Sequence, residues 1–201
     1  MLLFVLFFLS GGAALLYQVV WQRTLFSIYG INIESVTMVV TAFMLGLGLG
    51  SLAGGAISKD PKKPTVLLFA AVEAGIGLYG TFSLAILHGV GQATFALAPS
   101  LVGLTTFALV LLPTTLMGST LPLLVAHFTR ASKNVGRSVG SLYFVNTLGS
   151  AFASAAAVLV FLGWLGQSGT VRLAAALNFG ASAVAFVLHR RAVARATEAL
   201  S

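Results

Sequence analysis

The chain has 201 residues, of which 58% are hydrophobic and only 7% are charged, whereas roughly 25% of the residues of a soluble domain are charged. Its 11 basic and 4 acidic residues cannot supply the polar surface of a soluble fold, so the composition excludes an ordinary soluble domain. The lack of cysteine excludes disulfides, thiolate metal sites and cysteine nucleophiles. The net charge of +7 does not indicate a nucleic-acid partner, because the basic residues form short runs between apolar segments.

Six apolar segments are each long enough to cross a hydrocarbon core of ~30 Å, which takes about 20 helical residues. We expect all six to be helices, because a backbone in lipid must satisfy its own hydrogen bonds. The predicted spans are residues 2–22, 35–57, 65–87, 99–126, 138–162 and 171–188. No basic run precedes the first span, which favours a retained helix over a cleaved leader. The pattern predicts an all-α six-transmembrane-helix bundle that forms one domain, residues 1–201.

The basic residues between the spans predict an orientation. Two of the eleven, Arg23 and Arg172, fall on one side of the membrane if there are six spans. The other nine share the opposite side: Lys59, Lys62, Lys63, Arg130, Lys133, Arg137, Arg190, Arg191 and Arg195. Because cytoplasmic loops carry the excess of Lys and Arg, we expect a multi-pass protein of the cell inner (plasma) membrane with cytoplasmic N and C termini.

The first span ends in Tyr17, Trp21 and Arg23. Tyr and Trp are enriched at the boundary between lipid and water, and a nearby Arg can extend its charge to the surface. We therefore expect these three residues to be interface anchors.

The second span carries Gly46, Gly50 and Gly54 at intervals of four residues. Such a repeat makes a groove that another helix can approach closely. Two interpretations stand, a fixed packing surface and a sliding surface for a moving helix. A nucleotide-binding interpretation of this glycine-rich run is rejected, because it lies inside an apolar helix without a preceding strand.

The third span contains Glu73, an acidic residue eight residues from the predicted cytoplasmic start. At 1.5 Å per residue it lies about 12 Å deep, where an ionisable group is costly and usually functional. Gly77 and Gly80 follow on the same helix face, which is expected to pack against the bundle. One interpretation is a carboxylate that binds a cation, and the other is a neutral carboxyl that hydrogen-bonds between helices.

The fourth and fifth spans add polar groups at a similar depth. Pro113, Gly118 and Pro122 interrupt the fourth span, and each proline frees a backbone carbonyl. The fifth span carries one polar stripe: Tyr143, Asn146, Thr147, Ser150 and Ser154. The substrate-binding hypothesis therefore places Glu73, Thr120, Tyr143 and Asn146 in one polar layer, as broken helices do in transporters. The alternative is ordinary interhelical hydrogen bonding, at roughly 0.6 kcal/mol per bond.

Several of these segments resemble the membrane part of spermidine synthase-like proteins. The resemblance rests on residues 10–12 with 16–23, 43–51, 73–79, 112–122 and 142–149, and it keeps order and spacing from about residue 9 to 165. It implies a fold like half of a major facilitator transporter. In that family the membrane part is often fused to an aminopropyltransferase domain, whose Rossmann-like sequence is not found in residues 1–201.

The resemblance therefore implies a membrane module that has no catalytic residues and no cofactor in this chain. Its histidines are scattered at span ends, so no metal site is expected. Two functions are considered. The chain is either the non-catalytic module of a spermidine synthase-like system, which binds or passes a small cationic amine, or a structural subunit of a larger membrane complex such as a respiratory or photosynthetic assembly. Either function predicts contact with the lipid bilayer and pairing in the membrane, as a homodimer or with a protein partner.

Overall fold

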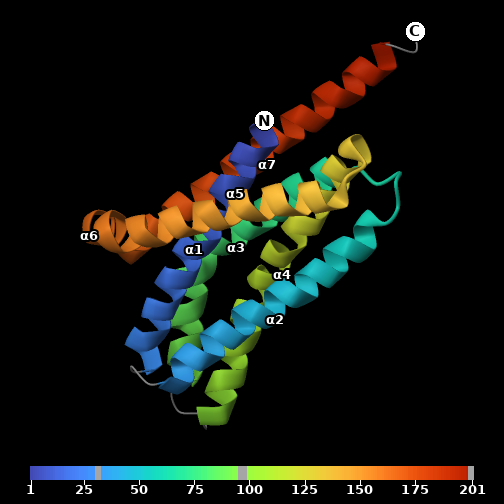
Figure 1. The fold of residues 1–201 in the computed structure, drawn as a ribbon. Coiled ribbons are helices and arrows are strands. Elements are labelled where there is room, and N and C mark those ends of the chain that lie inside the picture. The colour runs from blue at the N-terminus through green and yellow to red at the C-terminus, as the bar shows by residue number, and fades with distance from the viewer. Residues whose placement is uncertain (30–32, 95–98, 199–201) are drawn as a thin grey trace.

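A computed structural model describes residues 1–29, 33–94 and 99–198 of the chain. These ranges are almost entirely helical and contain no strand. Six of their helical segments are long and apolar enough to cross a membrane. The expected all-α six-helix bundle is therefore confirmed, and the chain is a polytopic membrane protein with lipid-facing helices (Figure 1).

The first four spans are single helices, and the fifth is built from three consecutive helical segments that end before the sixth. The helices are α1 (Leu2–Tyr29), α2 (Ile33–Ser58), α3 (Thr65–Thr94), α4 (Pro99–Ser132), α5 (Val135–Ala156), a π-helical segment η1 (Ala157–Phe161), α6 (Leu162–Trp164) and α7 (Gly166–Glu198). Leu165 separates α6 from α7, which begins at Gly166 with a φ of 63°, a conformation that glycine adopts without strain.

The helices are longer than the apolar segments that predict them. The predicted spans 2–22 and 171–188 correspond to helices Leu2–Tyr29 and Gly166–Glu198. Hydropathy marks only the part of a helix inside the hydrocarbon core, whereas Ala, Arg and Glu continue the same helix into water. The last turns of α7 accordingly extend beyond the rest of the bundle (Figure 1).

The bundle consists of one group formed by α1, α3, α5 and α7 and a second formed by α2 and α4. α3 and α5 pack against α1, α7 packs against both α1 and α3, and α4 joins this group to α2. The larger buried cluster is built around Tyr17 and Trp21 of α1, with Phe43 of α2 and Ile76 of α3. As a result α1 and α3 are the central helices, while much of the surface of α2 and α5 faces outward.

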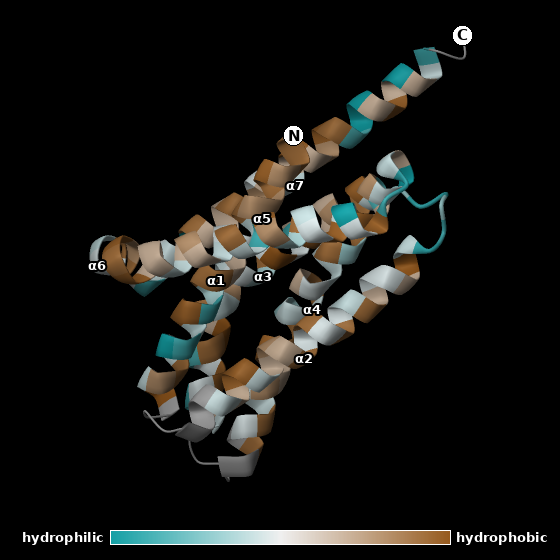
Figure 2. Cartoon of the chain, viewed as in Figure 1, coloured by the Kyte–Doolittle hydropathy of each residue, from teal (hydrophilic) through white to brown (hydrophobic). Residues whose placement is uncertain are grey.

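The polar segments gather at one end of the bundle. The N terminus, the loop 59–64, the turn between α4 and α5 and the end of α7 lie there (Figure 1). Figure 2 shows hydrophobic residues along most of each helix and hydrophilic residues at this loop and at the end of α7. Near the other ends of α1 and α7, Thr24 donates a hydrogen bond to Gln167 (2.8 Å), which brings the regions around Arg23 and Arg172 together.

Close backbone contact joins α2 to α4. A Cβ atom added at Gly46 or Gly50 would overlap Thr114 or the Thr115 carbonyl, and one at Gly54 would lie 2.7 Å from the Ser119 carbonyl oxygen. Gly118 makes the reciprocal approach to the backbone of Leu47. The three glycines of the repeat thus lie on a contact between two helices, where a side chain would force the backbones apart.

Pro113 lies inside α4, which continues through it. Proline has no N–H, so the carbonyl four residues earlier, that of Leu109, loses its helical partner. The Tyr79 hydroxyl of α3 donates a hydrogen bond to this carbonyl oxygen (2.8 Å). The freed acceptor therefore ties α4 to α3 instead of lining an open polar layer.

Candidate functional site: a buried carboxyl between three helices

Glu73 of α3 is completely buried, with 0% of its surface exposed. The Ser10 hydroxyl of α1 donates a hydrogen bond to Oε1 (2.5 Å), and the Asn178 amide of α7 donates one to Oε2 (2.7 Å). Both partners are uncharged and are themselves buried. The carboxyl group thus joins α1, α3 and α7 at one point without a basic partner in either hydrogen bond.

Small residues on the Glu73 face of α3 allow its neighbours to come close. A Cβ at Gly77 would lie 3.3 Å from both the Ala175 carbonyl oxygen and Asn178 Cβ of α7. The Tyr17 hydroxyl of α1 lies directly over Gly80, where a Cβ would overlap it. We use the name carboxyl centre for Ser10, Glu73 and Asn178, together with Tyr17, whose hydroxyl lies about two helical turns further along α3.

Two buried polar atoms of the carboxyl centre have no hydrogen-bond partner in the described ranges. Tyr17 Oη and Asn178 Oδ1 are both buried, and neither has a hydrogen-bond partner within the described ranges. A buried polar atom without a partner costs about 1–3 kcal/mol, so such atoms in a native fold call for an explanation such as a water or an ion. Both atoms can accept a hydrogen bond, and the centre therefore has more acceptors than the protein itself uses.

Further polar contacts run along the same three helices. Trp21 Nε1 donates to Ser83 of α3 (2.9 Å), and the Ser182 hydroxyl of α7 donates to the Ala70 carbonyl oxygen (2.7 Å). Each contact joins α3 to α1 or α7 at a different depth. The carboxyl centre is therefore held by a three-helix unit with hydrogen bonds on both sides of it.

The structure does not bring Asn146 or Tyr143 to Glu73. Asn146 Nδ2 donates to the Phe7 carbonyl oxygen of α1 (3.1 Å), and Tyr143 is 62% exposed on α5. The predicted stripe is too wide to face one neighbour, because residues three apart on a helix differ by about 60° in direction. Its members at 146 and 150 face α1, and those at 143 and 147 face outward.

Thr120 also lies apart from the carboxyl group in its hydrogen bonding. Its buried hydroxyl donates to the Met117 carbonyl oxygen of its own helix (2.7 Å), as the Thr115 hydroxyl does to Leu111 (2.8 Å). Hydroxyls one turn along a helix commonly bond back to its carbonyls. The shared polar layer expected over α3, α4 and α5 is thus replaced by a centre over α1, α3 and α7, and a substrate-binding role for Thr120 stays a prediction.

The expected interface anchors also differ from the structure. Tyr17 and Trp21 are 0% and 1% exposed, and their rings stack with centroids 5.1 Å apart inside the core. Phe43 and Tyr79 pack against the same indole. Aromatic residues near a span end can face either lipid or protein, and only the helix rotation decides between them. Of the three, only Arg23 is exposed.

Sequence reasoning missed Ser10 and Asn178 as partners of the carboxyl group, although a signal was available. Ser10 lies eight residues after Leu2, as Glu73 lies eight residues after Thr65, and Asn178 lies ten residues before Leu188. All three polar residues therefore have similar depths from the predicted cytoplasmic side. Depth alone would have selected Ser10 and Asn178 as candidates, together with the residues of spans four and five.

Comparison of the chain with models of known protein families, with curated proteins and with solved structures found no match.

Proposed function

We propose that this chain is a non-catalytic membrane module that binds a small cationic amine at the carboxyl centre. The observation that carries the proposal is a fully buried carboxyl group whose hydrogen-bond partners are both neutral. A charge near the middle of a bilayer costs roughly 2.5–3.5 kcal/mol on insertion scales, and such residues usually mark a ligand or ion site. A bound cation offsets this cost for the ionised carboxylate.

The chemistry of the centre matches an ammonium group. An ammonium offers three N–H donors and no acceptor. Asn178 Oδ1 provides an unpartnered acceptor on the amide that bonds Glu73, and Tyr17 Oη provides another further along α3, over Gly80. A carboxylate has about four lone-pair positions, of which Ser10 and Asn178 occupy two. Binding would require α1 or α7 to move, because the carboxyl is closed off in the described state.

The resemblance to spermidine synthase-like membrane parts supports a polyamine as the amine. Glu73 and Tyr79 fall in one matching segment and Ser10 and Tyr17 in another. In this proposal residues 1–201 are the membrane module, with a half-transporter arrangement of its helices, and the transfer chemistry belongs to a catalytic domain outside these residues.

The change Glu73→Gln tests the proposal, because it removes the charge while keeping the shape and most of the hydrogen bonding. A ligand at 100 times its Kd stabilises a folded protein by about 2.7 kcal/mol, so saturating spermidine is expected to raise the Tm of the parent protein in detergent. We expect no rise for Glu73→Gln. Asp60→Asn is the matched control, since Asp60 is an exposed carboxylate in the loop 59–64, and it should respond like the parent.

A contrary result favours the second function. If the parent and Glu73→Gln have equal Tm values and equal responses to spermidine, the Glu73 carboxyl is a neutral group that only hydrogen-bonds between helices. The two hydrogen bonds that close it already agree with such a role. The chain would then be interpreted as a structural subunit of a larger membrane complex.

We further propose that the basic end of the bundle is cytoplasmic and that the membrane is the cell inner (plasma) membrane. The lack of cysteine makes this measurable. Single substitutions Lys62→Cys and Arg172→Cys introduce thiols at exposed positions near opposite ends. A membrane-impermeant maleimide added to intact cells should label only Arg172→Cys, with Lys62→Cys labelled after the cells are opened. Labelling of Lys62→Cys in intact cells would show that the basic end lies outside the cytoplasm and would contradict the proposed orientation.

Pairing in the membrane is the remaining part of the proposal. α5 exposes the aromatic side chains of Tyr143, Phe144 and Phe152, and α2 exposes Met44 and Leu52. We propose that a second copy or another membrane protein covers these faces. Mass measurement after extraction in a mild detergent should give more than one chain per particle. A lone chain that still binds spermidine would contradict this part.

A further inference from the structure

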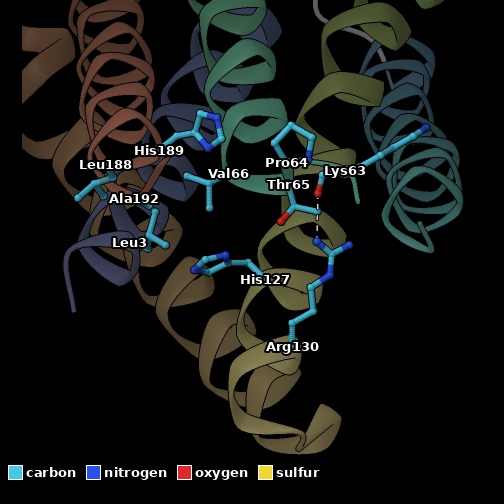
Figure 3. Close-up of a pocket in the computed structure, with 10 residues that line it drawn as sticks. All are labelled: Leu3, Lys63, Pro64, Thr65, Val66, His127, Arg130, Leu188, His189 and Ala192. Atoms are coloured by element: carbon cyan, nitrogen blue, oxygen red, sulfur yellow. Dashed lines mark hydrogen bonds between the residues drawn. The ribbon is translucent and has the colours of Figure 1, made fainter. Parts of the chain in front are cut away.

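A pocket of about 330 Å³ is lined by residues at the basic end of the bundle, about two helical turns from Ser10 and Glu73. The start of α1, the beginning of α3, the end of α4 and the end of α7 surround it (Figure 3). Its lining residues are Leu3, Lys63, Pro64, Thr65, Val66, His127, Arg130, Leu188, His189 and Ala192. None of these ten side chains is acidic, and four belong to basic residue types.

The cationic side of the pocket is fixed by the fold. Arg130 donates three hydrogen bonds to backbone carbonyl oxygens at the end of α2 and in the loop before α3, those of Ser58 (3.1 Å), Asp60 (2.8 Å) and Lys63 (3.0 Å). These acceptors are uncharged, so they hold the guanidinium in place without neutralising it. The guanidinium has five N–H donors, and two remain for a ligand.

Two imidazoles complete the polar wall. Figure 3 shows the rings of His127 and His189 on either side of Val66, while the Lys63 side chain points away from the cavity. The Asp60 carboxylate accepts a hydrogen bond from the Lys62 backbone N–H (2.9 Å) in the neighbouring loop. Besides the Thr65 hydroxyl, the side chains that can donate hydrogen bonds into the pocket are therefore His127, His189 and Arg130.

Most of the remaining wall is apolar and belongs to the membrane-spanning helices. Leu3, Val66, Leu188 and Ala192 belong to segments at the ends of the predicted spans. A cavity that combines hydrogen-bond donors with apolar side chains at the end of membrane-spanning helices can take both the phosphate and the glycerol and acyl part of a phospholipid. Basic pockets between helices on the cytoplasmic side are known to take anionic headgroups.

We propose that this pocket binds the phosphate group of an anionic phospholipid, held by Arg130, His127 and His189. A soluble phosphate offers the same charge but makes no use of the apolar walls, which is why the lipid is favoured. This site is independent of amine binding at Glu73.

Native mass spectrometry in a neutral detergent tests the proposal with phosphatidylglycerol as the probe. Phosphatidylglycerol is expected to bind more tightly than phosphatidylcholine of the same acyl chains. The double variant His127→Gln/His189→Gln, which leaves the Arg130 contacts intact, should weaken phosphatidylglycerol binding about fivefold, and Arg130→Gln should do so to a similar extent. His88→Gln, at the far end of α3, and Lys62→Gln, in the loop but outside the pocket, are matched controls that should keep the parent affinity.

Three results would overturn the proposal. Equal affinity for the two lipids would show that the charge is not recognised. Parent-like binding by the double histidine variant, which does not depend on the loop contacts of Arg130, would place the lipid elsewhere. Displacement of phosphatidylglycerol by millimolar glycerol 3-phosphate would show that the ligand is a soluble phosphate instead of a lipid.

Discussion

Replacing Gly50 by alanine is expected to destabilise the bundle by about 3 kcal/mol, the upper part of the usual range for overpacked positions. The added Cβ would overlap the Thr115 carbonyl oxygen and lie 2.9 Å from the Ser119 backbone nitrogen. Both atoms belong to the α4 backbone and cannot rotate away as a side chain can. α2 and α4 would have to separate along a contact that runs from Gly46 to Gly54.

Gly48→Ala is the matched control on the same helix. Gly48 is exposed, and a Cβ there would meet nothing within 4 Å. Alanine is the better helix former by up to about 1 kcal/mol, so this variant should be as stable as the parent or slightly more so. Thermal unfolding in detergent, followed by loss of the monodisperse peak, measures both variants. Equal stability of Gly50→Ala and Gly48→Ala would mean that α2 does not pack on α4 as described.

Trp21→Ala is expected to cost about 3 kcal/mol, the low end of the range for a buried tryptophan because the unpacked helix can still contact lipid. The indole is 1% exposed and packs on Tyr17, Phe43 and Tyr79. Its loss also leaves the Ser83 hydroxyl without its donor. α1 and α3 would lose their main contact on the side of the core away from Glu73.

Trp164→Ala provides the comparison for the second tryptophan of the chain. Trp164 is 86% exposed in α6, so its removal should change stability by no more than about 0.5 kcal/mol. Unfolding midpoints of the two alanine variants should therefore differ clearly. If Trp164→Ala were the more damaging change, Trp21 would be the interface anchor that the sequence predicts, and the described rotation of α1 would be incorrect.

The sequence predicts the number of spans and the grouping of basic residues well, because both depend on residue type and on distance along a helix. The sequence predicts less well which helices contact one another. Glu73 was expected beside Asn146 and Tyr143, but its hydrogen bonds go to Ser10 and Asn178. Depth in the membrane follows from counting residues, whereas the choice of adjacent helix depends on how whole surfaces pack.

Rotation about the helix axis is the second quantity that the sequence leaves open. Tyr143 and Asn146 lie three residues apart, yet the first is exposed and the second bonds to α1. Trp21 and Arg23 are two residues apart and face the core and the exterior. In a span that is apolar on every side no hydrophobic stripe marks the buried face, so small residues are the better guide. Gly77 and Gly80 were expected on a packed face of α3, and both lie against α7 or α1.

Equilibrium dialysis of radiolabelled spermidine against the purified protein in detergent tests the central claim most directly. The parent protein and Asp60→Asn should retain spermidine in a saturable manner, and Glu73→Gln, folded with an unchanged elution profile, should retain none above the detergent blank. Retention by Glu73→Gln equal to that of the parent at every spermidine concentration would contradict a cation site at the buried carboxyl.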